Sequence, residues 1–116
     1  MSIIHSMARK TLGGYLNASE YNPIHKDKIV AYSIEESLFT HTTHRMVARA
    51  INKVKQSGAE PCELNVMYYL EKHGIPRNIE EENELTAIMT EYAVTDKSFS
   101  DYYRELMLQR AKKVAI

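Results

Sequence analysis

Apolar side chains recur at three- and four-residue spacing along almost the whole chain, and alternation of apolar and polar residues is nowhere sustained. The first spacing gathers apolar side chains on one face of an α-helix, whereas a half-buried strand needs a two-residue period. Turn and capping residues divide the 116 residues into about six short helical segments. The sequence therefore predicts an all-α fold, a small bundle of about six helices forming one domain over residues 1–116.

Capping signals and apolar stripes set the expected helix boundaries. The expected helices are Ser2 to Leu16, one opened by Asn22-Pro23 with Ile24, Ile29 and Tyr32, one capped by Thr43 and ended by Gly58, one from Pro61 to about His73, one with a capping box of Asn78 and Glu81, and one from Ser98. Gly13-Gly14 is either a weak point of the first helix or a close-packing site. The wide face containing Leu64, Met67 and Tyr68 is expected in the core.

Charge, cysteine content and hydropathy limit the possible partners and location. Fifteen basic and fifteen acidic residues cancel, so the whole chain has no long-range attraction to nucleic acid or anionic lipid. The single cysteine, Cys62, cannot form an internal disulfide, and it lacks the local signature of a catalytic thiol. No apolar run approaches the roughly 18 residues that span a bilayer. We therefore expect a cytoplasmic protein without a membrane partner.

Motifs for chemistry are sparse. The four glycines do not form a phosphate-binding or dinucleotide-binding loop, so no nucleotide cofactor is expected in this domain. His41 and His44 could face a metal together with His5, His25 or His73, but without a His-Glu-x-x-His pattern we expect structural or surface roles. Neither a catalytic residue nor a metal ligand is assigned.

Clusters of charge are also interpreted as ordinary helix features. The acidic run Glu80 to Glu84 is expected to be a solvated helix start, because adjacent helical positions point in different directions. Basic residues on two helices could contact phosphate, but pairing with neighbouring acids and with helix dipoles accounts for most of these residues. We therefore expect the domain to contact DNA only indirectly. These residues are Arg45, Arg49, Lys53, Lys55, Arg104, Arg110, Lys112 and Lys113.

Four stretches resemble, in the same order, the N-terminal domain of bacterial or phage DnaB-type replicative DNA helicases. The most specific is Phe39 to Ile51, with a phenylalanine, a four-residue gap, His44-Arg45, an apolar pair and a closing Ala50-Ile51. The other three are Lys10 to Leu16, Gly58 to Gly74 and Tyr102 to Ala111. The chain departs from the family at Thr42, where proline is common, at Leu38, where an acid is common, and in the acidic loop after Gly74, and so resembles a distant member.

The resemblance implies a role in DNA replication. Members of the family are hexameric, ATP-driven rings, and the RecA-like motor that uses ATP and magnesium follows this domain. The resemblance therefore implies a non-catalytic domain that self-associates as a dimer or hexamer collar and binds the helicase-binding domain of primase or a helicase loader. Whether the 116 residues are an isolated piece or a truncated relative is left open.

Two groups of residues are assigned roles. We expect Phe39, His44, Val47, Ala50 and Ile51 to set the fold, with His44 hydrogen-bonded to a loop carbonyl. The last helix has more aromatic and apolar side chains than a single buried face can accommodate. The surplus side chains are the candidate partner contacts. These are Tyr103, Met107, Leu108, Val114 and Ile116.

Other functions remain open. The chain could instead be a helicase loader or a helicase-binding primase domain, which are also small helical proteins. A helix-turn-helix DNA-binding regulator is a further alternative, with the basic helix after Thr43 in the major groove. An enzyme is the least supported alternative.

Overall fold

The computed structural model describes the backbone of residues 3–114 and the side chains of residues 3–112. The described part is all-helical and contains no β-strand, which confirms the predicted fold class. It has seven α-helices and one 3-10 helix, more pieces than the six expected. They are α1 Ile3–Leu16, α2 Ala18–Tyr21, α3 Lys26–Val30, η1 Glu36–Leu38, α4 Thr42–Gln56, α5 Glu63–Lys72, α6 Ile79–Met89 and α7 Asp96–Val114.

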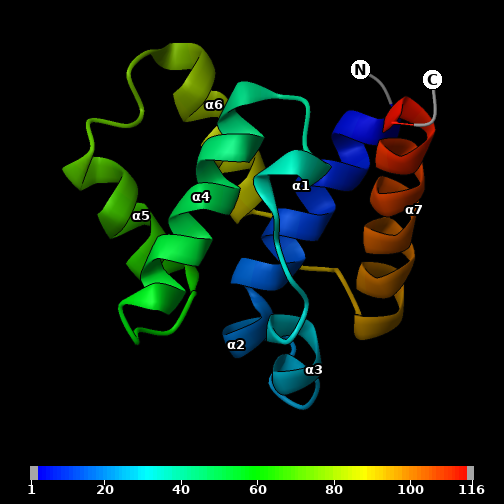
Figure 1. The fold of residues 1–116 in the computed structure, drawn as a ribbon. Helices are drawn as coiled ribbons and strands as arrows, with labels where there is room; N and C mark the ends of the chain where they lie inside the picture. Colours follow the sequence, from blue (N-terminus) through cyan, green and yellow to red (C-terminus); the bar gives the residue numbers. More distant parts are fainter. Residues whose placement is uncertain (1–2, 115–116) are drawn as a thin grey trace.

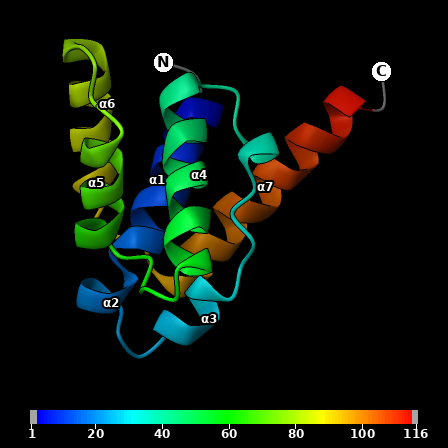
Figure 2. The same cartoon turned by 60° about the vertical axis from the view of Figure 1, so that its left-hand side comes forward.

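Helix α1 is the centre of the fold. It packs against α7, α6 and α4, and Figures 1 and 2 show it enclosed by these helices. Ala8, Leu12, Tyr15 and Leu16 are buried on it, at spacings that follow the helical period. The elements on either side of α1 therefore share one core.

Gly13 and Gly14 let α1 approach the chain around α6 closely. A Cβ atom on Gly13 would lie 2.3 Å from the backbone oxygen of Ile88, and one on Gly14 would lie 2.6 Å from Cγ1 of Val94. Neither distance is compatible with ordinary packing. Of the two interpretations of this pair, close packing is the one confirmed.

Helix α4 has the predicted stripe, with a different cap. Its N-cap is His41, whose Nδ1 accepts a hydrogen bond from the Thr43 backbone N–H at 3.2 Å, so the expectation that Thr43 is the cap is wrong. The Thr43 side chain is buried instead. The helix ends before Gly58, whose φ of 84° is a conformation that other residues rarely adopt, as predicted.

The helix predicted after Asn22-Pro23 is present as α3 but is shorter than expected: it contains Ile29 and neither Ile24 nor Tyr32. Asn22-Pro23 lies in the turn between α3 and the short helix α2, and Ile24 is 89% exposed. The reason is tertiary: the Asn17 side chain, which precedes α2, is buried and donates hydrogen bonds to the Met89 and Glu91 carbonyls. These bonds fix where the chain turns after α1.

Helix α5 buries less of its apolar face than predicted. Leu64 is 78% exposed and Tyr68 is 63% exposed, whereas Val66 and Leu70 are buried, so the expectation that the whole face is core is wrong. The helix packs mainly against α4, and a single neighbour covers only one narrow stripe. The remaining apolar side chains of α5, including Leu64 and Tyr68, form part of the surface.

The last two helices begin at side-chain caps. Asn78 accepts a hydrogen bond from the Glu81 backbone N–H at 2.9 Å, as predicted, but Glu81 bonds to the Arg77 backbone and side chain rather than to Asn78. Helix α7 begins at Asp96, two residues earlier than expected, because Thr95 and Ser98 exchange capping hydrogen bonds.

Candidate functional site

A buried carboxylate, Glu84, is the centre of a polar cluster between α1, α4 and α6. Arg9 on α1 donates from Nε to Oε2 and from Nη2 to Oε1, both at 2.6 Å. His44 on α4 places its Nε2 2.8 Å from Oε2, and His5 on α1 places its Nε2 3.2 Å from Oε1. Each of the two carboxylate oxygens therefore accepts two hydrogen bonds.

The prediction that the acidic run is a solvated helix start is wrong for two of its members. Glu81 and Glu84 are buried, whereas Glu80 and Glu82 are exposed. The apolar stripe of α6 contains a signal that would have found them. Glu81 and Glu84 lie one helical turn before Leu85 and Ile88, so they share the face of α6 that these apolar residues and Met89 form.

His44 bonds to a carboxylate, and the expectation of a loop carbonyl partner is wrong. Burial lowers the pKa of His44 to about 4, even though the hydrogen bond to Glu84 acts in the opposite direction. Burial alone raises the pKa of Glu84, but the hydrogen bonds from Arg9 and His44 outweigh it and hold that pKa below its usual range. At neutral pH the pair is therefore a neutral imidazole that donates to a carboxylate.

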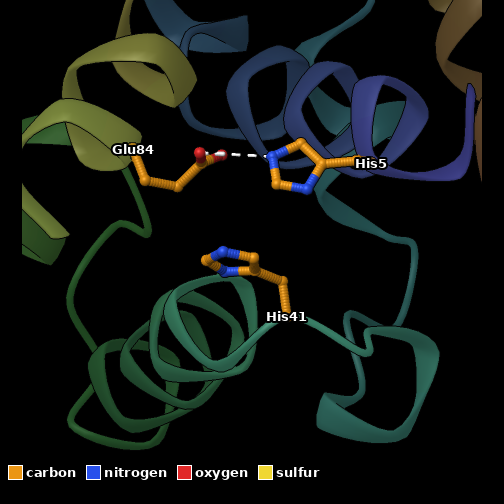
Figure 3. Close-up of side chains that lie close together, drawn as sticks. All are labelled: His5, His41 and Glu84. Carbon is orange, nitrogen blue, oxygen red and sulfur yellow. Dashed lines mark hydrogen bonds and ion pairs between the residues drawn. The ribbon is translucent and has the colours of Figure 1, made fainter. Parts of the chain in front are cut away.

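Three imidazoles meet beside Glu84. The ring centroids of His5, His41 and His44 lie 4.6 to 5.0 Å from one another. A pocket of about 220 Å³ lies against the three rings, and Figure 3 shows His5 and His41 facing Glu84 from α1 and from the start of α4. Of the five histidines in the sequence, His25 and His73 have their partners elsewhere, at Asp96 and at the Tyr69 carbonyl.

The residues expected to set the fold all lie in the interior. Phe39, His44, Val47, Ala50 and Ile51 are buried, and Phe39 contacts the His44 ring edge-on at a centroid distance of 6.3 Å. The polar cluster is therefore continuous with the apolar core through His44. The sequence block that contains these residues provides both packing and polar contacts.

The predicted partner contacts on α7 differ in accessibility. Tyr103 is half-buried, and its hydroxyl donates to the Ser33 carbonyl at 2.8 Å. Met107 is also half-buried against the core, whereas Leu108 is 50% exposed. Val114 is the last residue of α7, but its side chain and the whole of Ile116 lie outside the described residues. Leu108 is thus the most accessible of the described candidates.

A groove between α5 and α6 is a surface that the sequence did not indicate. It has a volume of about 400 Å³ and combines apolar with acidic side chains. The apolar ones include Met67, Leu85 and Met89, and the acidic ones are Glu63, Glu71 and Glu82. The exposed Leu64 and Tyr68 belong to the same helix as Met67. This part of the molecule presents the apolar, polar-rimmed surface that is typical of protein contacts.

Helix α4 has an exposed basic face. Arg45, Arg49 and Lys53 recur at four-residue spacing and are all exposed. Arg49 is paired with Glu36 of η1, with its Nη2 2.8 Å from Oε1. Part of the positive charge on this face is therefore neutralised within the chain.

Comparison with known proteins identifies no relative: no family model, curated protein or solved structure matches the chain. Over the described residues, none of the helices combines the length and the apolar character that crossing a bilayer requires.

Proposed function

We propose that the chain is a non-catalytic protein-binding domain equivalent to the N-terminal domain of a DnaB-type replicative helicase. The observation that supports this most is the burial pattern of the Phe39 to Ile51 block. Of the apolar positions on which the resemblance depends, Phe39, Val47, Ala50 and Ile51 are buried together with His44, and Met46 is half-buried. The burial of these four apolar positions agrees with the core role that the resemblance implies for them.

In this proposal the surface serves self-association into a collar and the binding of primase or a loader during DNA replication. Exposed apolar side chains on two separate helices support it, namely Leu64 and Tyr68 on α5 and Leu108 on α7. A domain with two such areas can contact a second copy of itself and a different protein at the same time. We assign self-association to α7 and partner binding to the exposed apolar face of α5 that contains Leu64 and Tyr68.

The test combines light scattering with titration against the helicase-binding domain of the primase from the same organism. Met107→Ala with Leu108→Ala should weaken self-association, and Leu64→Ser with Tyr68→Ser should weaken primase binding. Ile24→Ser is the matched control, because Ile24 is an exposed apolar residue outside both areas. The proposal is overturned if the folded wild-type domain neither self-associates nor binds primase, loader or the helicase motor.

A DNA-binding function has one observation in its favour, the exposed basic face of α4. The helix-turn-helix form of this function is not supported, because the element before α4 is the three-residue η1 and not a helix of matching length. Tight duplex binding that weakens steeply with salt, and that is lost in Arg45→Gln with Lys53→Gln, would favour the DNA-binding alternative. A preference for the helicase motor over primase would favour a loader.

A further inference from the structure

We propose that His5 of α1, His41 at the start of α4 and Glu84 of α6 form a zinc-binding site where these three elements meet. One ligand atom from each of the three residues lies within 4.8 Å of the others. The side chains come from three different elements, and Figure 3 shows them directed towards a common point. This inference is independent of the proposed function, because it depends only on these side chains.

The distances between the side chains suit a tetrahedral ion. Two ligand atoms bound at about 2.1 Å in tetrahedral geometry lie about 3.4 Å apart. His5 Nε2 lies 3.2 Å from Glu84 Oε1, so this pair is already close to the required separation. The His41 ligand atom lies within 4.8 Å of the other two, so the proposed site closes by rotation of the half-buried His41 ring towards them.

The donor set selects zinc over the harder cations. Two imidazoles and one carboxylate are a common zinc ligand set, whereas magnesium and calcium prefer oxygen ligands throughout. In the bound state His5 presents an unprotonated Nε2 to the ion, and its ring proton moves to Nδ1. His44 continues to donate to the other oxygen of Glu84 at 2.8 Å and so fixes the orientation of the carboxylate. The pocket beside His5 and His41 provides space for water at the fourth position.

Two features limit the affinity of the site. The Arg9 guanidinium shares Glu84 with the ion, and its positive charge opposes the ion's charge. His41 must also give up its cap, because an Nδ1 that carries a proton or binds zinc cannot accept from the Thr43 N–H. The loss of this bond provides a specific marker, since the Thr43 amide should shift when zinc binds.

The experiment titrates metal-free protein with zinc by calorimetry, with cobalt as the spectroscopic probe and the Thr43 amide followed by NMR. We expect one ion per chain, tetrahedral cobalt absorption bands and a shift of the Thr43 amide. His5→Gln and His41→Gln should each reduce zinc affinity by more than about tenfold. His73→Gln is the matched control, because His73 is an exposed histidine at the end of α5 whose ring bonds to the Tyr69 carbonyl.

The two glutamine variants retain Glu84 with Arg9 and His44, so their folding can be checked by circular dichroism before titration. The proposal is overturned if wild-type protein binds no zinc, if cobalt gives only an octahedral spectrum, or if both variants bind as tightly as wild type. A loss of binding in His73→Gln alone would likewise overturn it, since the ion would then be bound at the protein surface.

Discussion

His44 and Glu84, which are 40 residues apart in the sequence, face each other with Nε2 2.8 Å from Oε2 and so join α4 to α6. The same carboxylate is bound by Arg9 and His5, so one side chain connects three helices. A buried charge is costly unless its hydrogen bonds are complete, and Glu84 meets that condition only in this arrangement of helices. The cluster therefore stabilises one relative placement of α1, α4 and α6.

Replacing Glu84 by glutamine should destabilise the fold by about 3 kcal/mol, because Arg9 loses its charged partner in a part-buried position. Urea unfolding followed by circular dichroism measures the change. Glu82→Gln removes an exposed carboxylate from the same helix and should alter stability by no more than about 0.5 kcal/mol. Equal effects in the two variants would contradict the structural role of Glu84.

Stability should decrease as the pH falls from about 6.5 to 4. Burial lowers the pKa of His44 to about 4 in the folded chain, against 6.5 for an unperturbed histidine, so between these values the unfolded chain binds a proton that the folded chain does not. The lowered pKa of Glu84 acts in the same direction, because its contribution is present above the unfolded value of 4.5 and is lost below it. Urea midpoints across this range measure the slope.

Two variants separate the contribution of His44 from that of the other histidines. His44→Gln keeps an N–H donor for Glu84 but does not titrate, so the slope between pH 6.5 and 5 should become flatter. His73→Gln should leave it unchanged. An unchanged slope in His44→Gln would show that a different group controls the acid sensitivity.

Alanine at Gly14 should destabilise the protein by about 1–3 kcal/mol through overpacking, although alanine favours helix formation. Its Cβ would meet Val94 Cγ1, so the double variant Gly14→Ala with Val94→Ala should recover part of the loss. Gly13→Ala should not be rescued in this way, because its Cβ would meet the Ile88 backbone oxygen. Thermal unfolding of the wild-type protein, the two glycine variants and each of these combined with Val94→Ala tests the distinction, and rescue at both positions would contradict it.

Tyr103→Phe should lower the free energy of unfolding by about 1 kcal/mol. The hydrogen bond from the Tyr103 hydroxyl is lost, and the Ser33 carbonyl is left without that donor. Burial raises the pKa of Tyr103, so its phenol should titrate above the usual value in ultraviolet difference spectra. Tyr102→Phe is the neighbouring control and should have a smaller effect. A loss of stability confined to Tyr102→Phe would contradict the role of Tyr103 in holding α7.

The sequence alone indicated the long helices well. Helices α1, α4, α6 and α7 were predicted because their apolar stripes and end residues act locally, as with Asn78 at the start of α6. The bounds of the helix after Asn22 were predicted wrongly, because hydrogen bonds from Asn17 to residues more than 70 positions away decide where the chain turns. Local spacing carries no information about such bonds.

The polar cluster likewise combines a feature that local sequence predicts with contacts that only the packed fold determines. The helical spacing places Glu84 on the buried stripe of α6, so its burial could have been predicted, but its partners Arg9 and His5 lie 75 and 79 residues away. Pairing His41 with His5 required the observed packing of α1 against α4. Likewise, a stripe on α5 indicates that a neighbour exists without showing how much of Leu64 and Tyr68 it covers.

The close approach at Gly13 and Gly14 also determines how descendants of this chain can diverge. Most surface positions can drift freely, but any side chain at Gly13 would collide with main-chain atoms of Ile88 that no compensating mutation removes. A larger residue at Gly14 is best tolerated together with a smaller one at Val94. In very distant homologues, the two adjacent glycines of α1 should therefore be retained longest, even where no other stretch of the sequence remains identical.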